Sequence, residues 1–176
     1  MVNRRPTYIR TVLEMGIDVL FTDLDMVWLE NPMAFLPDGY DMHVVEDLHP
    51  DNTPPDYEWL PMNMGFVYMS STEPVLELVA LWNKKISASP QTPDQVVMND
   101  ILKERVHRDT LKINVLDNRE FPNGWNYFNR NWNTKFPTST VRVVHNDMVH
   151  GYNPKVKRFK KRGMWYIKEE HNNIDG

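Results

Sequence analysis

The chain has 176 residues, a hydrophobic fraction of 41%, a charged fraction of 25% and a formal net charge of −4 at pH 7. These values are typical of a single globular domain, here taken as residues 1–176, that buries a sizeable core. The sequence contains no cysteine, which excludes disulfides and thiolate metal sites, and neither half is basic enough to favour a nucleic-acid partner.

The first predicted element is a helix from Thr7 to Met15, with Thr7 as a candidate N-cap. Its apolar face is formed by Ile9, Val12 and Leu13. The breaker Gly16 then precedes an apolar run that ends at Thr22 and has the length of a buried strand. We therefore expect a helix that leads into a core strand.

Two carboxylates, Asp23 and Asp25, follow at the point where the apolar run ends. Residues two apart on an extended chain point to the same side, so both carboxylates can converge on one cation. Oxygen ligands in small number, with room for phosphate oxygens, suit magnesium or manganese bound together with a nucleotide. The alternative interpretation is a solvated strand-to-turn junction with an Asx turn before Asn31 and Pro32.

Two further strands are predicted, over Met42 to Glu46 and over Met62 to Ser71. They are separated by the proline-rich segment 47–61, which is interpreted as a surface connection, with a lid over a site as the alternative. Within the second strand, Gly65 indicates a bulge or the close approach of another group. Asn63 offers an amide that can bond a ligand hydroxyl.

Two amphipathic helices come next, and the first, capped by Ser71 or Thr72, is predicted to serve packing. Its apolar positions are Val75, Leu78, Val79, Trp82 and Ile86. The second helix opens at Thr92–Gln95, where a Thr-x-x-Gln capping box accounts for Gln95 without any chemistry. Asp94 has a similar explanation, because an acid in the first turn balances the helix dipole.

The C-terminal part begins with a predicted strand, Lys112 to Leu116, and an aromatic segment, Asn118 to Thr134, which lines either a ligand groove or the core. A β-branched strand, Val141 to Val144, then delivers His145 at its end. A neutral imidazole can complete a hard-ion site whose charge comes from carboxylates, and manganese accepts such mixed ligation. His150 is a competing ligand.

The segment 155–162 carries six cations and is interpreted mostly as a solvated face. One or two of these cations near a diphosphate leaving group would also be chemically useful, because the departing oxygen gains negative charge as the bond breaks.

Residues Phe21 to Pro32, which read Phe-Thr-Asp-Leu-Asp-Met-Val-Trp-Leu-Glu-Asn-Pro, resemble the signature of the nucleotide-diphospho-sugar transferase family. This family includes plant rhamnogalacturonan-II xylosyltransferases and extensin arabinosyltransferases. Three later stretches match in the same order: Asn63–Phe66, Asp94–Asn99, and His145–Asn146 followed by Gly151, Lys155 and Trp165. The resemblance implies an α/β fold of GT-A type, a mixed sheet with helices on both faces.

The resemblance also implies roles for individual residues. The metal, manganese or magnesium, would be held by Asp23, Asp25 and His145, although the Gly and Lys lie further from His145 than in the pattern His-x-x-Gly-x-x-Lys. Donor-binding residues would be Asp23, Asn63, Gly65 and Lys155. The catalytic positions beside the donor sugar would be Asp94 and Gln95.

The implied reaction is transfer of a sugar, with a pentose such as xylose as the expected member, from a UDP-sugar to a glycan or glycoprotein acceptor with retention of configuration. The family implies the Golgi lumen, whereas this chain has no apolar run approaching a membrane span. Relatives carry a nucleotide-base-binding strand upstream of the Asp-x-Asp strand, so we expect this chain to be an N-terminally truncated domain.

The sequence is also compatible with two alternative functions. An inactive remnant of such a domain follows if the upstream strands are essential. A phosphatase of the haloacid-dehalogenase type follows if Asp23 is a nucleophile, because Asp23 to Val27 also fits that motif, although no clear acidic pair on a predicted strand follows.

Overall fold

The computed structural model of the protein describes residues 4–47, 61–104, 111–129, 134–136 and 140–168. Most of the proline-rich segment predicted between the second and third strands therefore lies outside the described residues, as does Trp132 of the aromatic segment.

The main sheet has four strands in the order β1-β4-β3-β5. They are β1 (Val19–Thr22), β3 (Met42–Glu46), β4 (Met62–Met69) and β5 (Ile113–Leu116). β4 pairs antiparallel with both β1 and β3, whereas β3 and β5 are parallel. The sheet is therefore mixed, as expected, and all four strands lie where the apolar runs predicted them.

Two short strands form a separate antiparallel ribbon, β2 (Met26–Trp28) with β6 (Val143–His145). Met26 is opposite His145 in this ribbon. The pairing brings the end of the Asp-x-Asp segment to the predicted histidine, which lies more than a hundred residues later in the chain.

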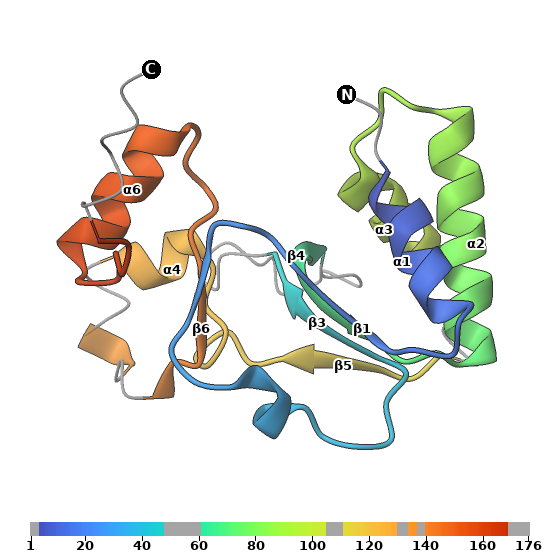
Figure 1. The fold of residues 1–176 in the computed structure, drawn as a ribbon, viewed down its shortest axis with the longest axis horizontal. Helices are drawn as coiled ribbons and strands as arrows, with labels where there is room; N and C mark the ends of the chain where they lie inside the picture. The colour runs from blue at the N-terminus through green and yellow to red at the C-terminus, as the bar shows by residue number, and fades with distance from the viewer. Residues whose placement is uncertain (1–3, 48–60, 105–110, 130–133, 137–139, 169–176) are drawn as a thin grey trace.

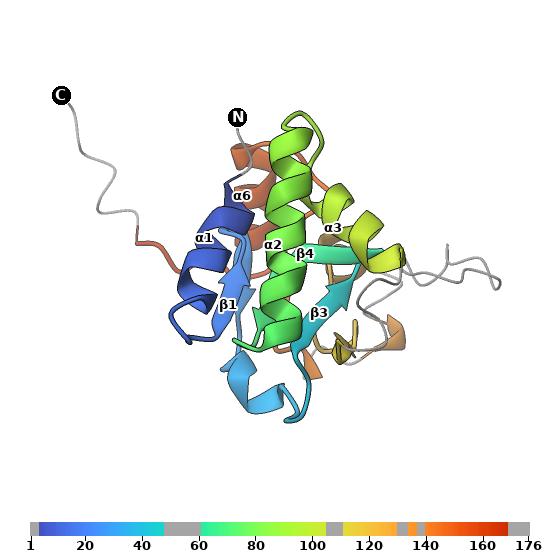
Figure 2. The same ribbon diagram turned by 90° about the vertical axis from the view of Figure 1, so that its right-hand side faces the viewer.

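Three helices cover one face of the main sheet: α1 (Arg5–Leu13), α2 (Glu73–Ala88) and α3 (Asp94–Lys103). α2 lies between α1 and α3, in front of the strands (Figure 2). The core here consists of residues such as Leu13, Val44, Val67, Leu78, Trp82 and Ile101, all fully buried. α1 begins at Arg5 with Pro6 in its first turn, so Thr7 is not the N-cap that the sequence predicted.

The other face of the sheet is covered by the β2–β6 ribbon and by the short 3-10 helix η1 (Pro32–Phe35). Beyond the ribbon lie α4 (Gly124–Phe128) and α6 (Tyr152–Lys161), on the opposite side of the molecule from α1 to α3 (Figure 1). The predicted arrangement of helices on both sides of a mixed sheet is therefore confirmed. Among the described helices, none combines the length and the apolar character needed to cross a membrane.

A bulge in β4 shapes the region where the site forms. Val44 is paired with Val67, yet the next residue, Val45, is paired with Asn63, so 64–66 have no counterpart in β3. This stretch turns toward β1 instead, and the Asp23 amide donates to the Gly65 carbonyl at 2.7 Å. Both the bulge and the close approach that Gly65 predicted are present.

Candidate active site

Three side chains from three separate elements converge at one edge of the sheet. Asp23 follows β1, Asp25 immediately precedes β2, and His145 is the last residue of β6. One ligand atom from each lies within 4.8 Å of the others. His145 Nε2 is 3.4 Å from Asp25 Oδ1 and 3.7 Å from Asp23 Oδ2. The backbone supports this geometry, because the Asn146 amide donates to the Asp25 carbonyl at 2.9 Å.

The charges at this cluster are strongly coupled. Burial alone would raise the pKa of Asp25, but hydrogen bonds from His145 and Lys155 outweigh it and hold that pKa well below its usual range. Burial raises the pKa of Asp23, with Arg5 and His145 opposing the shift. Burial would lower the pKa of His145, yet the neighbouring carboxylates, led by Asp25, raise it.

The donor set fits a hard divalent cation. Two carboxylates and one imidazole form the group among the described residues, and such oxygen-rich mixed ligation suits manganese or magnesium. The Lys155 ammonium donates to Asp25 Oδ2, so a cation already balances this carboxylate. Lys155 is held in place from the same strand end, because Asn146 Nδ2 donates to the Lys155 carbonyl at 2.9 Å. His150, the competing ligand, is exposed and outside the group.

We predict opposite pH dependences for metal binding and for metal-free stability. A proton and a metal compete for His145 Nε2, and the raised pKa means that the proton is lost above the ordinary value of 6.5. Manganese affinity should therefore rise with pH across that window, by at most about tenfold per pH unit for one proton. The free energy of unfolding of the metal-free chain should fall across the same window, because a raised pKa stabilises the fold only while the group is protonated.

Calorimetric manganese titrations and urea unfolding between pH 6 and 9 test this prediction. A His145→Asn variant is the control, and it should flatten both profiles. Parallel rather than opposite trends in the wild-type chain would contradict the prediction.

Asp147 extends the cluster, and sequence reasoning missed it. Its Oδ2 lies 3.4 Å from His145 Nδ1, on the side of the ring away from Asp25. Asp147 Oδ1 accepts a hydrogen bond from the Gly124 amide at 2.6 Å, and Oδ2 accepts one from Asn63 Nδ2 at 2.9 Å. The spacing contained a signal, because Asp147 lies two residues after His145 just as Asp25 lies two after Asp23.

Asn63 connects the bulge to a second carboxylate that was missed. Its Oδ1 accepts from the Gly65 amide at 2.8 Å, and its Nδ2 also donates to Asp47 Oδ1 at 2.7 Å. Burial raises the pKa of Asp47. Asp47 follows β3 directly, as Asp23 follows β1. An acidic residue at the end of a predicted strand could therefore have identified Asp47 as a candidate site residue.

Gln95 is part of the same network rather than of a capping box. α3 begins at Asp94, its N-cap is Pro93, and no side chain caps it, so the predicted Thr-x-x-Gln box is wrong. Gln95 Oε1 accepts from the Met64 amide at 2.9 Å, and Nε2 donates to Asp47 Oδ2 at 2.9 Å. The Gln95 side chain therefore ties α3 to the bulge and to Asp47.

Asp94 is buried and faces Arg5 of α1, with Oδ2 2.8 Å from the Arg5 Nε. Its Oδ1 also accepts from the Gln95 amide at 2.8 Å, which agrees with the first-turn interpretation of this acid. Arg5 was not predicted as a site residue, yet its guanidinium also lies 4.7 Å from the centroid of the Phe21 ring. Arg5 and Asp94 thus form an ion pair, and the charge of Arg5 also acts on Asp23.

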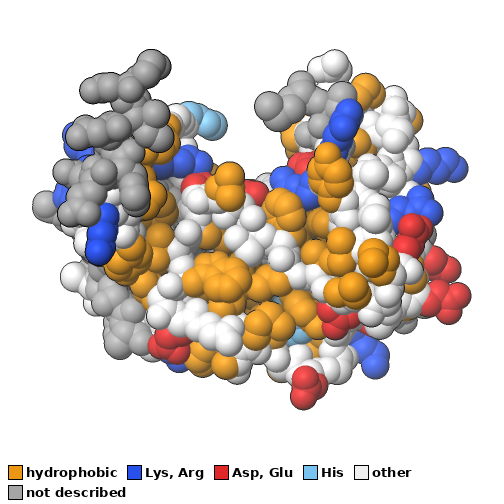
Figure 3. Space-filling model, in the orientation of Figure 1, with side chains coloured by type: hydrophobic (Ala, Val, Ile, Leu, Met, Phe, Trp, Pro, Cys, Tyr) orange, Lys and Arg blue, Asp and Glu red, His pale blue; other side chains and the backbone are white. Residues whose placement is uncertain are grey.

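An open pocket of about 270 Å³ collects these groups. Its lining residues are Asp23, Asp25, Asp47, Asn63, Gln95, His145, Asp147, Met148 and Lys155. Figure 3 shows a hollow between the part that carries α4 and α6 and the part that carries α1 to α3, with charged side chains at its floor. Gly65 and Asp94, two of the predicted site residues, are not among the lining residues.

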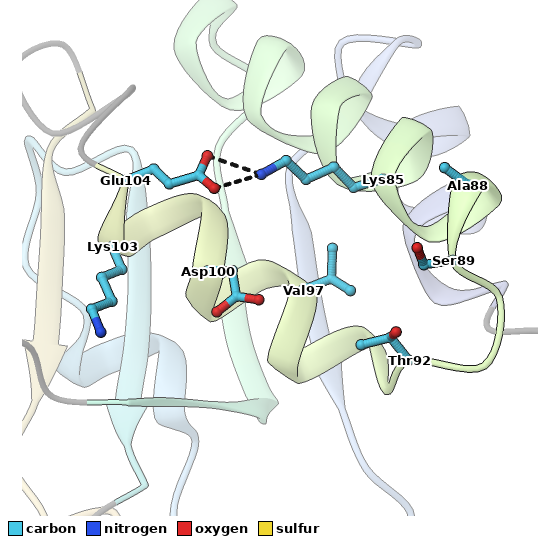
Figure 4. Close-up of a pocket in the computed structure, with 8 residues that line it drawn as sticks. All are labelled: Lys85, Ala88, Ser89, Thr92, Val97, Asp100, Lys103 and Glu104. Carbon is cyan, nitrogen blue, oxygen red and sulfur yellow. Dashed lines mark hydrogen bonds and ion pairs between the residues drawn. The ribbon is translucent and has the colours of Figure 1, made fainter.

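A second cavity, of about 580 Å³, lies between the end of α2 and α3 (Figure 4). Its lining residues are Lys85, Ala88, Ser89, Thr92, Val97, Asp100, Lys103 and Glu104. Lys85 Nζ is already paired with Glu104 at 2.9 Å. None of the converging carboxylates or His145 reaches this cavity, so we assign the chemistry to the pocket at Asp23 and Asp25.

The sequence profile described as nucleotide-diphospho-sugar transferase matches residues 1–159. The chain belongs to this family. A UDP-D-xylose:L-fucose alpha-1,3-D-xylosyltransferase of Arabidopsis thaliana is 28% identical to it, with 95% of this chain and 47% of the relative covered. A UDP-galactose:fucoside alpha-3-galactosyltransferase of Dictyostelium discoideum is 25% identical over 98% of this chain and 29% of the relative.

This nucleotide-diphospho-sugar transferase chain therefore spans about half the length, or less, of these curated relatives. A crystal structure of a glycosyltransferase involved in glycosylation of the major capsid of PBCV-1 superimposes with a TM-score of 0.59 at 13% identity. The superposition covers 92% of this chain and 75% of that one. The fold is thus the GT-A type that the resemblance implied.

Proposed function

We propose that this chain forms the catalytic core of a metal-dependent glycosyltransferase that moves a sugar from a UDP-sugar to a hydroxyl of a glycan or glycoprotein acceptor. The observation that carries the proposal is the convergence of Asp23, Asp25 and His145 with Lys155 in one pocket. Family membership supports a nucleotide-sugar donor. The named specificities of the relatives favour a UDP-sugar, and UDP-xylose is the first donor to test.

The pocket residues would have different roles in this reaction. A divalent cation held by Asp23, Asp25 and His145 would offset the negative charge of the departing diphosphate. The Lys155 ammonium, which donates to Asp25, would stabilise the same oxygens as the glycosidic bond breaks. Asn63 and the Gly65 backbone, fixed by their mutual hydrogen bond, would orient the donor sugar.

The resemblance implied catalytic positions for Asp94 and Gln95. We propose that these two residues act by holding other groups of the pocket in position. Gln95 lines the pocket, and its amide holds both the bulge and the pocket carboxylate Asp47. Asp94 would act through Arg5, which it holds near Asp23. By analogy with the family we expect transfer with retention of configuration, and we place the reaction in the Golgi lumen.

The test is release of UDP from a series of UDP-sugars with manganese, followed by proton NMR of the new anomeric centre. We expect release to require manganese, and the product to keep the donor's anomeric configuration. Inversion would overturn the retaining assignment. Failure to bind UDP with manganese would favour an inactive remnant of the domain.

We predict that Gln95→Met lowers kcat by on the order of 100-fold, because loss of both hydrogen bonds frees the bulge and Asp47 from their positions. The measurement is kcat and KM for the UDP-sugar found active. Gln91→Met is the matched control, since Gln91 is exposed and outside the pocket, and it should leave both constants unchanged. An equal effect of the two substitutions would refute the assignment.

A further inference from the structure

Met148, in the connection between β6 and α6, has a left-handed backbone conformation. Its φ is +55°, and no other non-glycine residue in the described ranges has a positive φ. This conformation is strained for a bulky L-residue, because its Cβ comes too close to the following carbonyl oxygen. Glycine would form the same turn without strain, and asparagine with less of it. The turn by itself therefore does not explain a methionine at this position.

The backbone on the N-terminal side of Met148 is held by two other parts of the chain. The Asn146 amide donates to the carbonyl of Asp25, next to β2, at 2.9 Å. Asp147 Oδ1 accepts from the amide of Gly124, the first residue of α4, at 2.6 Å. A strained residue persists where its surroundings fix the chain in this way, and such residues cluster at ligand sites. One of the two contacts comes from Asp25, so the conformation of Met148 is tied to the candidate metal site.

Burial in a core does not compensate for this strain. Met148 is 48% exposed. It belongs to none of the three clusters of buried hydrophobic residues that the described residues form. It lines instead the open pocket of about 270 Å³ that contains Asp23, Asp25 and His145. Met148 thus lies where a ligand of this pocket can contact its side chain.

The chemistry of the pocket indicates which part of a ligand would contact Met148. Among the described residues that line the pocket, Met148 is the apolar one, and the others carry carboxylates, amides, an imidazole or an ammonium. A sugar ring matches such a lining, because its hydroxyls require polar partners and its C–H face requires an apolar one. A diphosphate does not match Met148, since a thioether is a weak acceptor and has no hydrogen to donate to phosphate oxygens.

We propose that the Met148 side chain contacts the C–H face of a bound sugar ring and thereby helps to determine which sugar the pocket accepts. The inference rests on the proposed function for the statement that the ligand is a sugar. An unbranched, polarisable thioether adapts its shape to the ring that it contacts. The ring belongs either to the donor or to the acceptor, and the experiment distinguishes these two sources.

The direct test is a nuclear Overhauser effect between the carbon-13-labelled methyl group of Met148 and the ligand, measured on the full chain with diamagnetic magnesium. The signal is assigned by its loss in Met148→Leu. We expect cross-peaks to the xylose protons of UDP-xylose if the ring is the donor's. If it is the acceptor's, we expect them to one of the methyl pyranosides of galactose, glucose, xylose and fucose, added with UDP. Cross-peaks to the uracil of UDP instead, or to none of these ligands, would overturn the proposal.

In Met148→Gly, stability and sugar affinity should change in opposite directions. Glycine relieves the strain, so Tm should rise by about 2–4 °C. The affinity for the sugar ligand that gives the cross-peaks should fall about fivefold, because the apolar contact is lost. Met148→Leu keeps an apolar side chain of similar volume and should retain the affinity within about twofold. A fall in Tm together with the loss of affinity would make Met148 a structural residue only, and an unchanged affinity would refute the contact.

Met33→Gly is the matched control, because Met33 is 45% exposed, lies in η1 and is outside the pocket. Its φ is not positive, so glycine there should lower Tm and leave every affinity unchanged. Equal losses of affinity in Met33→Gly and Met148→Gly would refute a specific contact.

UDP alone, titrated with magnesium on the same samples, separates this inference from the proposed function. We expect UDP to bind equally well to the wild-type chain and to Met148→Gly. A chain that binds no UDP contradicts the proposed function and, with it, the sugar assigned to Met148. A chain that binds UDP while no sugar contacts Met148 contradicts this inference alone.

Discussion

Replacing Asp25 with Asn should lower the rate of the proposed sugar transfer by roughly a thousandfold, because the shape of the side chain is kept while the charge of a proposed metal ligand, worth several kcal/mol, is lost. The same substitution removes the carboxylate to which Lys155 donates, so an ammonium is left without its partner. Manganese binding should become undetectable by calorimetry at concentrations where the wild-type chain binds. The control is Asp100→Asn, an exposed acid in the cavity between α2 and α3, which should retain full binding and rate.

The free energy of unfolding at acidic pH gives a second test of the charge on Asp25. Its pKa is held below the ordinary value of 3.8, so it stabilises the fold above that value and the contribution is lost as the pH falls further. The Asn variant lacks this contribution, and the gap in unfolding free energy between it and the wild-type chain should close as the pH drops below 3.8. A gap independent of pH would mean that Asp25 does not carry the charge assigned to it.

Gly65→Ala should abolish manganese-dependent nucleotide binding and also lower the free energy of unfolding by about 1–3 kcal/mol, the usual cost of overpacking. An added Cβ would lie 2.5 Å from His145 Cε1, 2.7 Å from Asp23 Oδ2 and 2.9 Å from Asn63 Oδ1. His145 and Asp23 belong to the candidate metal site, and Asn63 accepts a hydrogen bond from the Gly65 amide within the bulge. None can move away without changing the geometry of the site.

The Gly39→Ala variant measures the effect of backbone strain without any steric contact of the added Cβ. Gly39 has a φ of +87° with nothing within 4 Å of an added Cβ, so alanine there should cost about 1 kcal/mol of stability from strain alone. Nucleotide binding should survive in that variant. Calorimetry and thermal unfolding on both variants test the pair, and preserved binding in Gly65→Ala would contradict the position assigned to the bulge.

Short-range patterns were sufficient to locate the four strands of the main sheet and the candidate metal ligands, but they did not predict β2. The apolar run before Asp23, the two-residue spacing to Asp25 and the β-branched run before His145 each reflect the period of an extended chain, which is a local property. The same local reasoning predicted the start of α2 after Thr72 but failed at the starts of α1 and α3. Gln95 suited a capping box, but its amide satisfies the Met64 backbone, which an isolated helix does not offer.

The sequence by itself thus determined which residues can ligate a cation and that Gly65 would be closely approached. The partners of those residues were decided only by tertiary structure: Asn63 with Asp147 across 84 positions, Gln95 with Asp47 across 48, and Arg5 with Asp94 across 89. The first two pairs depend on strand register, and the bulge in β4 shifts that register in a way that the alternation of side chains along the strand does not predict. The third pair joins the helices α1 and α3. Asp47 and Asp147 therefore became site residues only once the bulge and the β2–β6 ribbon placed them beside His145 and Asn63.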